Sequence, residues 1–159
     1  MKLSWDSSKW IVSDLIKGRS DPPFFILGVR KGLNMVERVI ATDEALALIA
    51  QLQAEHSEIM FHQSGGCCDN SAANCYLPTD LTIGPYDIKL GEVGGVPFFI
   101  GKLQYEYWKH TQLILDVIEG HGGTFSLEGS TGKAFHTRSR LFTDQEWQLI
   151  ESQVLKDLS

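Results

Sequence analysis

Hydrophobic and polar residues follow regular periods from about residue 35 onward, and these periods separate helices from strands. The apolar residues at 36–40 predict a strand, and residues 58–63 predict another. Between them, apolar residues recur at helical spacing, namely Ala45, Leu48, Ile49 and Leu52. Thr42 is a suitable cap for this helix, because its hydroxyl can accept a hydrogen bond from a first-turn N–H. We therefore predict a helix that begins after Thr42 and ends near 56–57.

The rest of the pattern predicts strands joined by glycine-rich turns, and a final helix. Strands are expected over residues 86–91, 97–100, 112–118, 124–128 and 135–141, with a short helix over 102–110. Gly94-Gly95 is typical of a two-residue hairpin turn, and Phe125 and Leu127 are expected to point inward. Residues 143–146 match a capping box that opens the last helix. Its inward face is expected to contain Trp147, Ile150 and Val154.

These elements together predict an α+β fold with a mostly antiparallel or mixed sheet of about six or seven strands and two main helices. We expect residues 35–159 to form a single domain. Residues 1–34 show no clear period, and one hypothesis is that they are an N-terminal extension that is not part of the functional chain, which would then start at Met35. The alternative is an N-terminal helix over residues 7–17, docked by Trp10.

Composition and charge narrow the class of protein. The 159 residues carry a formal net charge of −6, and no cluster of Lys and Arg occurs, so nucleic acid is not an expected partner. No apolar run approaches the roughly 18 to 20 residues that span a bilayer, so no membrane partner is expected. The N-terminus lacks an apolar leader pattern. We therefore expect a cytoplasmic protein with reduced thiols, in which clustered cysteines indicate a metal or redox site.

All three cysteines lie within nine positions, on a segment rich in residues that break regular structure. A long loop is predicted over residues 64–84. Cys67, Cys68 and Cys75 together with His62 would make a Cys3His ligand set, which suits a tetrahedral zinc ion or an iron–sulfur cluster. Adjacent cysteines in extended chain point to opposite sides, and the familiar C-x2-C spacing is absent. We call residues 62–75 the cysteine segment.

Two other interpretations of the cysteines remain open. In a thiol redox site, Cys67 or Cys68 would be the reactive thiol and Cys75 the resolving one. Alternatively, the cysteines are small buried apolar side chains. His110, His121 and Asp116 are weaker candidates for a site, and the chain has no Ser-His-Asp pattern, phosphate-binding loop or dinucleotide fingerprint.

Several motifs resemble a small bacterial family of unknown function. They are His62-Gln63-Ser64-Gly65-Gly66-Cys67-Cys68-Asp69, Cys75-Tyr76, Leu90-Gly91-Glu92, residues 107–117, residues 122–128 and residues 137–143. The resemblance covers about residues 35–150, and members typically begin near the position of Met35. The chain departs from the family pattern at Asn70 and at Ala73-Asn74.

Genes of this family often lie beside acetaldehyde or alcohol dehydrogenase genes. The resemblance implies an accessory role for an aldehyde or alcohol dehydrogenase, as a metal carrier, maturation factor or regulator. The alternatives are a small thiol redox protein and a structural partner subunit stabilised by zinc, and self-association into a homo-oligomer is left open. Because a nicotinamide site is absent, dehydrogenase activity of the chain itself is not expected, and a role other than enzyme is favoured.

The order of elements is also similar to that of the A-type iron–sulfur carrier proteins. Gly65-Gly66-Cys67, Leu115-Asp116 and Gly123-Thr124-Phe125 would correspond to motifs of that fold. The C-terminal Cys-Gly-Cys of those carriers is missing. The resemblance therefore implies a shared fold and says little about shared chemistry.

Overall fold

The computed structural model describes residues 29–30, 35–63 and 72–157. The described residues form an α+β structure, which confirms the predicted fold class. The chain divides into two compact units, one made of residues 38–141 and the other of residues 1–37 with 142–159. We describe each unit by itself. The extension predicted over residues 1–34 stays a prediction, because nearly all of that range lies outside the described residues, as does the alternative helix over 7–17.

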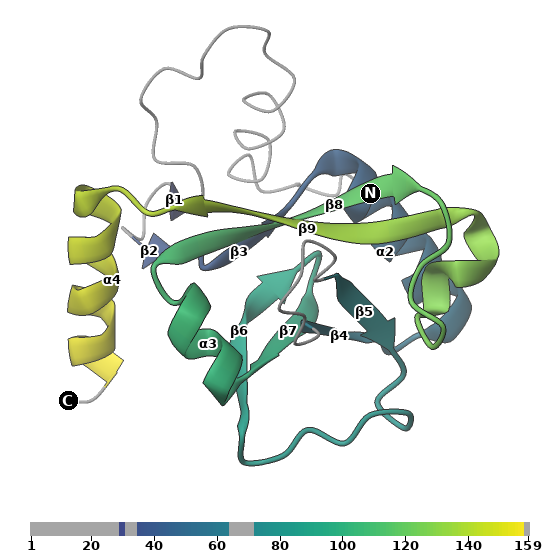
Figure 1. The fold of residues 1–159 in the computed structure, drawn as a ribbon, viewed down its shortest axis with the longest axis horizontal. Helices are drawn as coiled ribbons and strands as arrows, with labels where there is room; N and C mark the ends of the chain where they lie inside the picture. Colours follow the sequence, from purple (N-terminus) through teal and green to yellow (C-terminus); the bar gives the residue numbers. More distant parts are fainter. Residues whose placement is uncertain (1–28, 31–34, 64–71, 158–159) are drawn as a thin grey trace, which may run out of the picture. The chain divides into compact units, whose positions relative to one another are not determined.

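Two mixed sheets make up most of the larger unit (Figure 1). One has the order β3-β8-β9, with the strands β3 Val39–Ala41, β8 Thr111–Glu119 and β9 Lys133–Leu141. The other has the order β5-β4-β7-β6, with the strands β4 Met60–Gln63, β5 Ala73–Tyr76, β6 Asp87–Val93 and β7 Val96–Gly101. The β3–β8 and β4–β7 pairs are parallel, and the other pairs are antiparallel.

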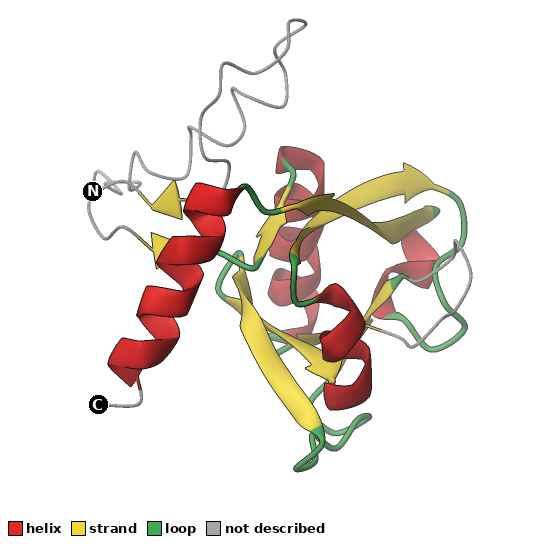
Figure 2. Ribbon diagram, turned by 60° about the vertical axis from the view of Figure 1, so that its left-hand side comes forward, coloured by secondary structure: helices red, strands yellow, loops and turns green. Residues whose placement is uncertain are grey.

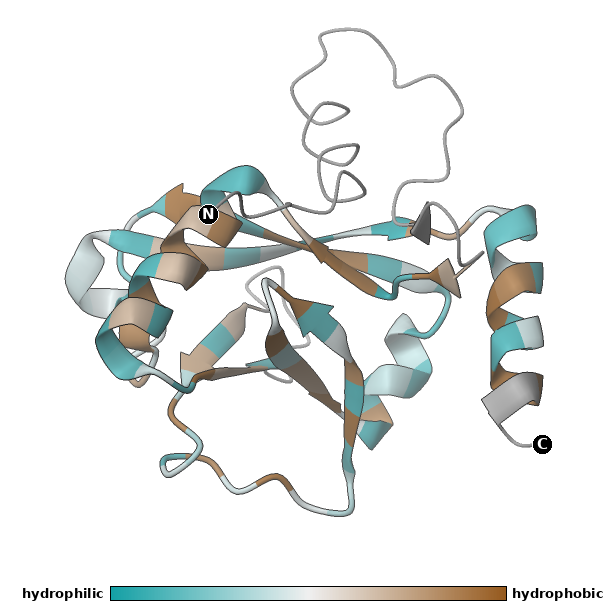
Figure 3. Ribbon diagram, turned by 180° about the vertical axis from the view of Figure 1, so that it is seen from behind, coloured by the Kyte–Doolittle hydropathy of each residue, from teal (hydrophilic) through white to brown (hydrophobic). Residues whose placement is uncertain are grey.

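Helix α2, Asp43–His56, packs its apolar face into the core of this unit. Thr42 caps it by accepting a hydrogen bond from the Ala45 backbone N–H at 3.2 Å, as predicted. The four predicted core positions of the helix are all buried. Three aromatic rings fill the space between the sheets: Phe61 stacks on Phe98 and meets Phe135 edge to face. Figure 3 shows apolar stretches, coloured brown, along strands of the sheets.

The remaining elements of the larger unit are short. Helix α3, Lys102–Trp108, follows β7, and the 3-10 helix η1, Leu127–Thr131, precedes β9. Gly94 and Gly95 join β6 to β7 with φ angles of 59° and 80°, values that glycine adopts without strain. The predicted hairpin turn is therefore confirmed.

The smaller unit contains two short strands and one helix. The strands β1 Val29–Arg30 and β2 Met35–Val36 pair antiparallel, and helix α4 runs over Asp144–Asp157 (Figure 2). The predicted capping box is present: the Thr143 backbone N–H donates to the Glu146 carboxylate at 2.8 Å, and the Glu146 N–H donates to the Thr143 hydroxyl at 3.2 Å. Ile150 is buried as predicted, but Val154 is 47% exposed, so its predicted inward position was wrong.

Three predicted elements differ from the structure. The single strand over 36–40 is replaced by β2 and β3. The predicted loop over 64–84 contains β5, an edge strand whose Ala73 and Cys75 side chains point into the core. The strand predicted over 124–128 is wrong, because residues 127–131 form η1 and Phe125 is 81% exposed. Phe125 was expected in the core only because residues 124–128 were assumed to alternate between inward and outward positions, as in a strand.

The described residues contain nine strands and three α-helices, against the six or seven strands and two main helices predicted. Among the described residues, no helix is both long enough and apolar enough to span a bilayer. The similarity to A-type iron–sulfur carriers stays a prediction.

Candidate functional site

A hydrogen-bonded clamp joins the two ends of the cysteine segment. Gln63 ends β4 and Ala73 begins β5, and the two residues are paired in register. The Thr137 hydroxyl on β9 donates to the Gln63 side-chain oxygen at 3.0 Å and accepts from the Ala73 N–H at 3.1 Å. Gln63 is buried, so its side-chain oxygen needs such a partner. One threonine thus ties both ends of residues 64–72 to the other sheet.

His62 is paired with an acidic residue across the outer face of the four-stranded sheet. Its Nε2 lies 2.9 Å from Asp87 Oδ1 on β6, and both side chains are 21% exposed. The second carboxylate oxygen of Asp87 accepts the Gly84 N–H at 2.8 Å. These contacts, the one to His62 first, lower the pKa of Asp87. Asp87 is therefore a fixed carboxylate that orients the imidazole.

His62 and Cys75 do not point to the same side of their strands. In the β4–β5 register His62 pairs with Asn74, and Phe61 pairs with Cys75. Directly paired residues share a face and neighbouring residues alternate. Phe61 and Cys75 are buried in the core, so His62 and Asn74 lie on the opposite face. In this arrangement the two residues cannot ligate one metal ion.

Cys75 is a fully buried thiol. Its exposed fraction is 0%, and its backbone N–H donates to the Ser126 hydroxyl at 2.8 Å. Burial, reinforced by the nearby Glu128 carboxylate, raises the pKa of the Cys75 thiol to about 12. A thiol with this pKa is protonated at neutral pH, whereas both metal binding and nucleophilic attack need the thiolate.

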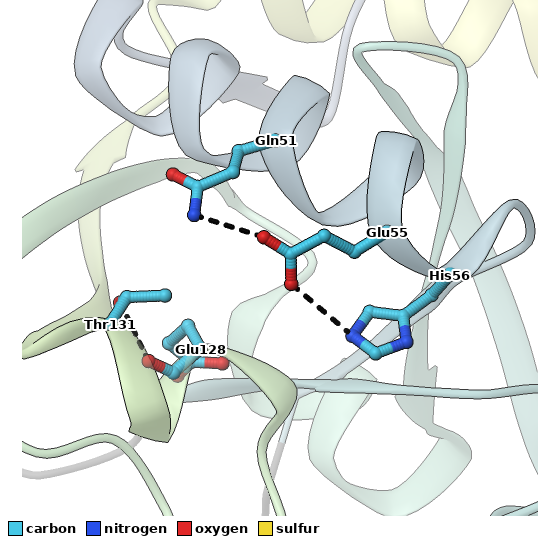
Figure 4. A network of polar contacts seen from close by, with 5 residues as sticks. All are labelled: Gln51, Glu55, His56, Glu128 and Thr131. Carbon is cyan, nitrogen blue, oxygen red and sulfur yellow. Dashed lines mark hydrogen bonds and ion pairs between the residues drawn. The ribbon is translucent and has the colours of Figure 1, made fainter.

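Glu128, beside Cys75, is a buried acidic residue that the sequence did not single out. It is 1% exposed, and burial raises the pKa of its carboxyl group. Ser126 Oγ donates to one carboxylate oxygen, and the Phe135 N–H donates to the other at 3.4 Å. Figure 4 shows Glu128 and Thr131 of η1 near α2, which contacts η1. The Thr131 hydroxyl closes η1 by donating to the Glu128 carbonyl at 2.7 Å.

Gly122 and Gly123 allow the segment before η1 to pack closely against neighbouring side chains. A Cβ atom added to Gly123 would lie 2.5 Å from the Asn74 side-chain oxygen, and one added to Gly122 would overlap the Glu128 carboxylate. Because Cys75 also bonds Ser126, residues 122–128 run along β5. The exposed His121 directly precedes this segment in the sequence.

The predicted ligand set is only partly within the described residues. Cys67 and Cys68 lie outside them, so their role stays a prediction. Among the described residues, no group of three or more His, Cys, Asp or Glu side chains could hold a metal ion. The weaker candidate Asp116 is satisfied by side chains, because it accepts the Thr42 hydroxyl at 2.8 Å and pairs with Arg138. His110 is exposed at the end of α3.

Sequence reasoning missed three residues that shape this site. Asp87, Glu128 and Thr137 come from elements far from the cysteine segment along the chain, and only the fold brings them to it. Glu128 and Thr137 did belong to motifs of the resemblance, in residues 122–128 and 137–143. The sequence around them gives no further signal, because Thr137 stands between His136 and Arg138 and looks like any other polar strand residue.

The comparison with protein families assigns this chain to one of them. Residues 48–141 match the family described as "Domain of unknown function (DUF779)", and this range is more than half of the chain. It includes the cysteine segment, the His62–Asp87 pair, Glu128 and Thr137. No curated protein matched the chain. The protein therefore belongs to the DUF779 family of unknown function.

Proposed function

We propose that this chain is a cytoplasmic accessory protein that holds a metal ion or an iron–sulfur cluster on the cysteine segment. It would serve an aldehyde or alcohol dehydrogenase as a metal carrier, maturation factor or regulator. The observation that carries the proposal is the position of His62. This imidazole is oriented by Asp87 at the end of the strand that leads directly into the segment with Cys67 and Cys68.

The donor chemistry fits a soft or borderline metal. Thiolate and imidazole are the ligands of zinc and of iron–sulfur clusters that lack one cysteine. Metal-bound histidines commonly pair their second nitrogen with a carboxylate, as His62 does with Asp87. The Thr137 clamp supports the proposal further, because it fixes the two ends of the segment.

Cys75 fits the ligand set poorly. Its burial, its raised thiol pKa and its position on the face opposite His62 all disfavour a shared metal. We therefore propose Cys67, Cys68 and His62 as the ligands. Three protein ligands leave a coordination position open, which suits a carrier that passes its metal to a partner.

The burial of Cys75 also bears on the thiol redox alternative. A resolving cysteine must be reached by its partner and react as thiolate. The Cys75 side chain meets neither condition in the described conformation. The partner in the proposal comes from the family resemblance, in which neighbouring genes encode aldehyde or alcohol dehydrogenases.

The first experiment is elemental analysis with a visible spectrum, on protein purified anaerobically without chelator. We expect near-stoichiometric metal in the wild type and in Cys75→Ala, and its loss in the Cys67→Ser/Cys68→Ser variant. Metal-free wild type with three titratable thiols would end the metal proposal. The carrier role is tested by mixing loaded protein with metal-depleted alcohol dehydrogenase, whose activity should return only with the loaded wild type.

A further inference from the structure

We propose that Asp87 is a positioning residue that keeps the proton of neutral His62 on Nε2 and leaves Nδ1 as the nitrogen that binds the metal. This inference rests on the proposed function for its metal, while the placement of the proton can be tested without it. Asp87 lies 25 positions from His62 in the sequence and belongs to no motif of the cysteine segment.

The geometry makes the carboxylate an acceptor and the imidazole a donor. Asp87 Oδ2 already accepts the Gly84 N–H at 2.8 Å, which holds the carboxylate in place. Its other oxygen lies 2.9 Å from His62 Nε2. An ionised carboxylate can only accept, so Nε2 must carry a proton. In the neutral imidazole Nδ1 is then unprotonated and presents its lone pair.

The sheet itself leaves room for this pair. His62 pairs with Phe99 of β7, and Asp87 pairs with Gly101 two residues further along β7, so all four positions share the outer face. A Cβ atom added to Gly101 would meet no atom within 4 Å. The outer face therefore has open space above Gly101 on β7, the strand that lies between β4 with the imidazole and β6 with the carboxylate.

This arrangement serves a metal ligand better than a structural histidine. A fixed carboxylate orients the ring, selects the tautomer and raises the basicity of the free nitrogen, and loss of such a partner costs about 10- to 100-fold in metal affinity. The pair is partly exposed, so a ligand can approach it from the open face.

The test combines two measurements on the full chain and its Asp87→Asn, Asp87→Glu and Asp116→Asn variants. Nitrogen NMR of the metal-free protein distinguishes the two neutral tautomers of His62. Titration with Co²⁺ alone reports affinity through its visible spectrum. We expect Nε2–H in the wild type and a mixed tautomer with about 10- to 100-fold weaker Co²⁺ binding in Asp87→Asn.

Two matched variants separate positioning from folding. Asp87→Glu should restore the tautomer and part of the affinity, and Asp116→Asn, which removes a carboxylate of the other sheet, should change neither. Wild-type affinity in Asp87→Asn, or a wild-type His62 protonated on Nδ1, would overturn the inference. Wild type that binds no Co²⁺ but shows Nε2–H would overturn the proposed function and leave the positioning role of Asp87 supported.

Discussion

His62 and Cys75 lie on adjacent, paired strands but point to opposite faces of the sheet. His62 meets Asp87 near solvent, and Cys75 is sealed in the core beside Ser126. A four-ligand site that uses both would require β5 to turn over or to leave the sheet. Cys75 therefore supports the fold from within the core, whereas His62 lies on the partly exposed face of the same sheet.

Replacing Cys75 should separate these two roles. We expect Cys75→Ala to keep wild-type Co²⁺ stoichiometry, because a buried protonated thiol contributes packing and no ligand. Its free energy of unfolding should fall by about 1 kcal/mol, since little volume is lost. Metal titration and urea denaturation measure both quantities, with Cys67→Ser as the comparison. Loss of metal from folded Cys75→Ala would show that Cys75 is a ligand after all.

The Thr137 clamp should be worth a measurable part of the stability. Thr137→Val keeps the shape of the side chain but leaves the Gln63 oxygen and the Ala73 N–H without their partner. Unpaired buried groups cost about 1–3 kcal/mol, and we expect a loss in that range by urea denaturation. Hydrogen exchange of the Ala73 amide should also become faster.

Ser139→Ala is the matched control for the clamp. Ser139 lies two residues further along β9 and is exposed. Its replacement should leave both the stability and the Ala73 exchange rate unchanged. If Thr137→Val and Ser139→Ala changed the free energy of unfolding and the Ala73 exchange rate equally, the hydrogen bonds of Thr137 would not be what stabilises this region.

Glu128 should make the stability depend on pH. Because burial raises the pKa of its carboxyl above the ordinary value of 4.5, the folded state binds the proton more tightly than the unfolded state does. The tighter binding of this proton contributes to the free energy of unfolding in full below about pH 4.5. The contribution is lost as the pH rises through the pKa of Glu128 in the folded state. Glu128→Gln cannot ionise, so its stability relative to wild type should improve from pH 4.5 to pH 8.

Urea denaturation at several pH values measures this difference. The control is Glu119→Gln, an exposed residue at the end of β8, which should show the same pH dependence as wild type. If the difference in free energy of unfolding between Glu128→Gln and wild type stays constant across this pH range, burial does not raise the pKa of Glu128.

The contact between Gly123 and Asn74 predicts a coupled pair of substitutions. In Gly123→Ala the new Cβ would displace the Asn74 side chain, which also donates to the Tyr76 hydroxyl at 3.0 Å. We expect a loss of about 1–3 kcal/mol, typical of overpacking. In an Asn74→Ala background the same change should cost nothing, because the overlapping atom is gone.

Gly129→Ala provides the matched glycine control, since a Cβ there would meet nothing within 4 Å. Thermal or urea unfolding of the single and double variants completes the cycle. Additive effects of Gly123→Ala and Asn74→Ala would contradict the close approach of the two residues.

Elements specified by neighbouring residues could be predicted, and elements specified by distant partners could not. Helix α2 and the capping box of α4 depend on contacts between residues three or four positions apart. Their patterns can therefore be recognised in the sequence. Strand β5 is only four residues long and exists because β4 pairs with it. The turn of η1 depends on Glu128, whose partners include Phe135 seven residues later.

The same distinction applies to the candidate site. Residue types pointed to the cysteine segment, and its donors were named from the sequence. The face on which each donor lies depends on strand register, and a one-residue difference decides between core and solvent. His62 and Cys75 could not be assigned to opposite faces until β5 was known to be a strand and its partners were known.

Thr42 has a consequence for how the chain is synthesised. Its hydroxyl accepts from Ala45, three residues away, and donates to Asp116, 74 residues away. On the ribosome the helix cap can therefore form early, whereas the bond to Asp116 must wait until most of the chain has emerged. Strand β3 shares this delay, because its partner is β8. Until β8 is synthesised, the edge of β3 that pairs with it can pair with other chains. A slow stretch of translation before β8 would prolong that exposure.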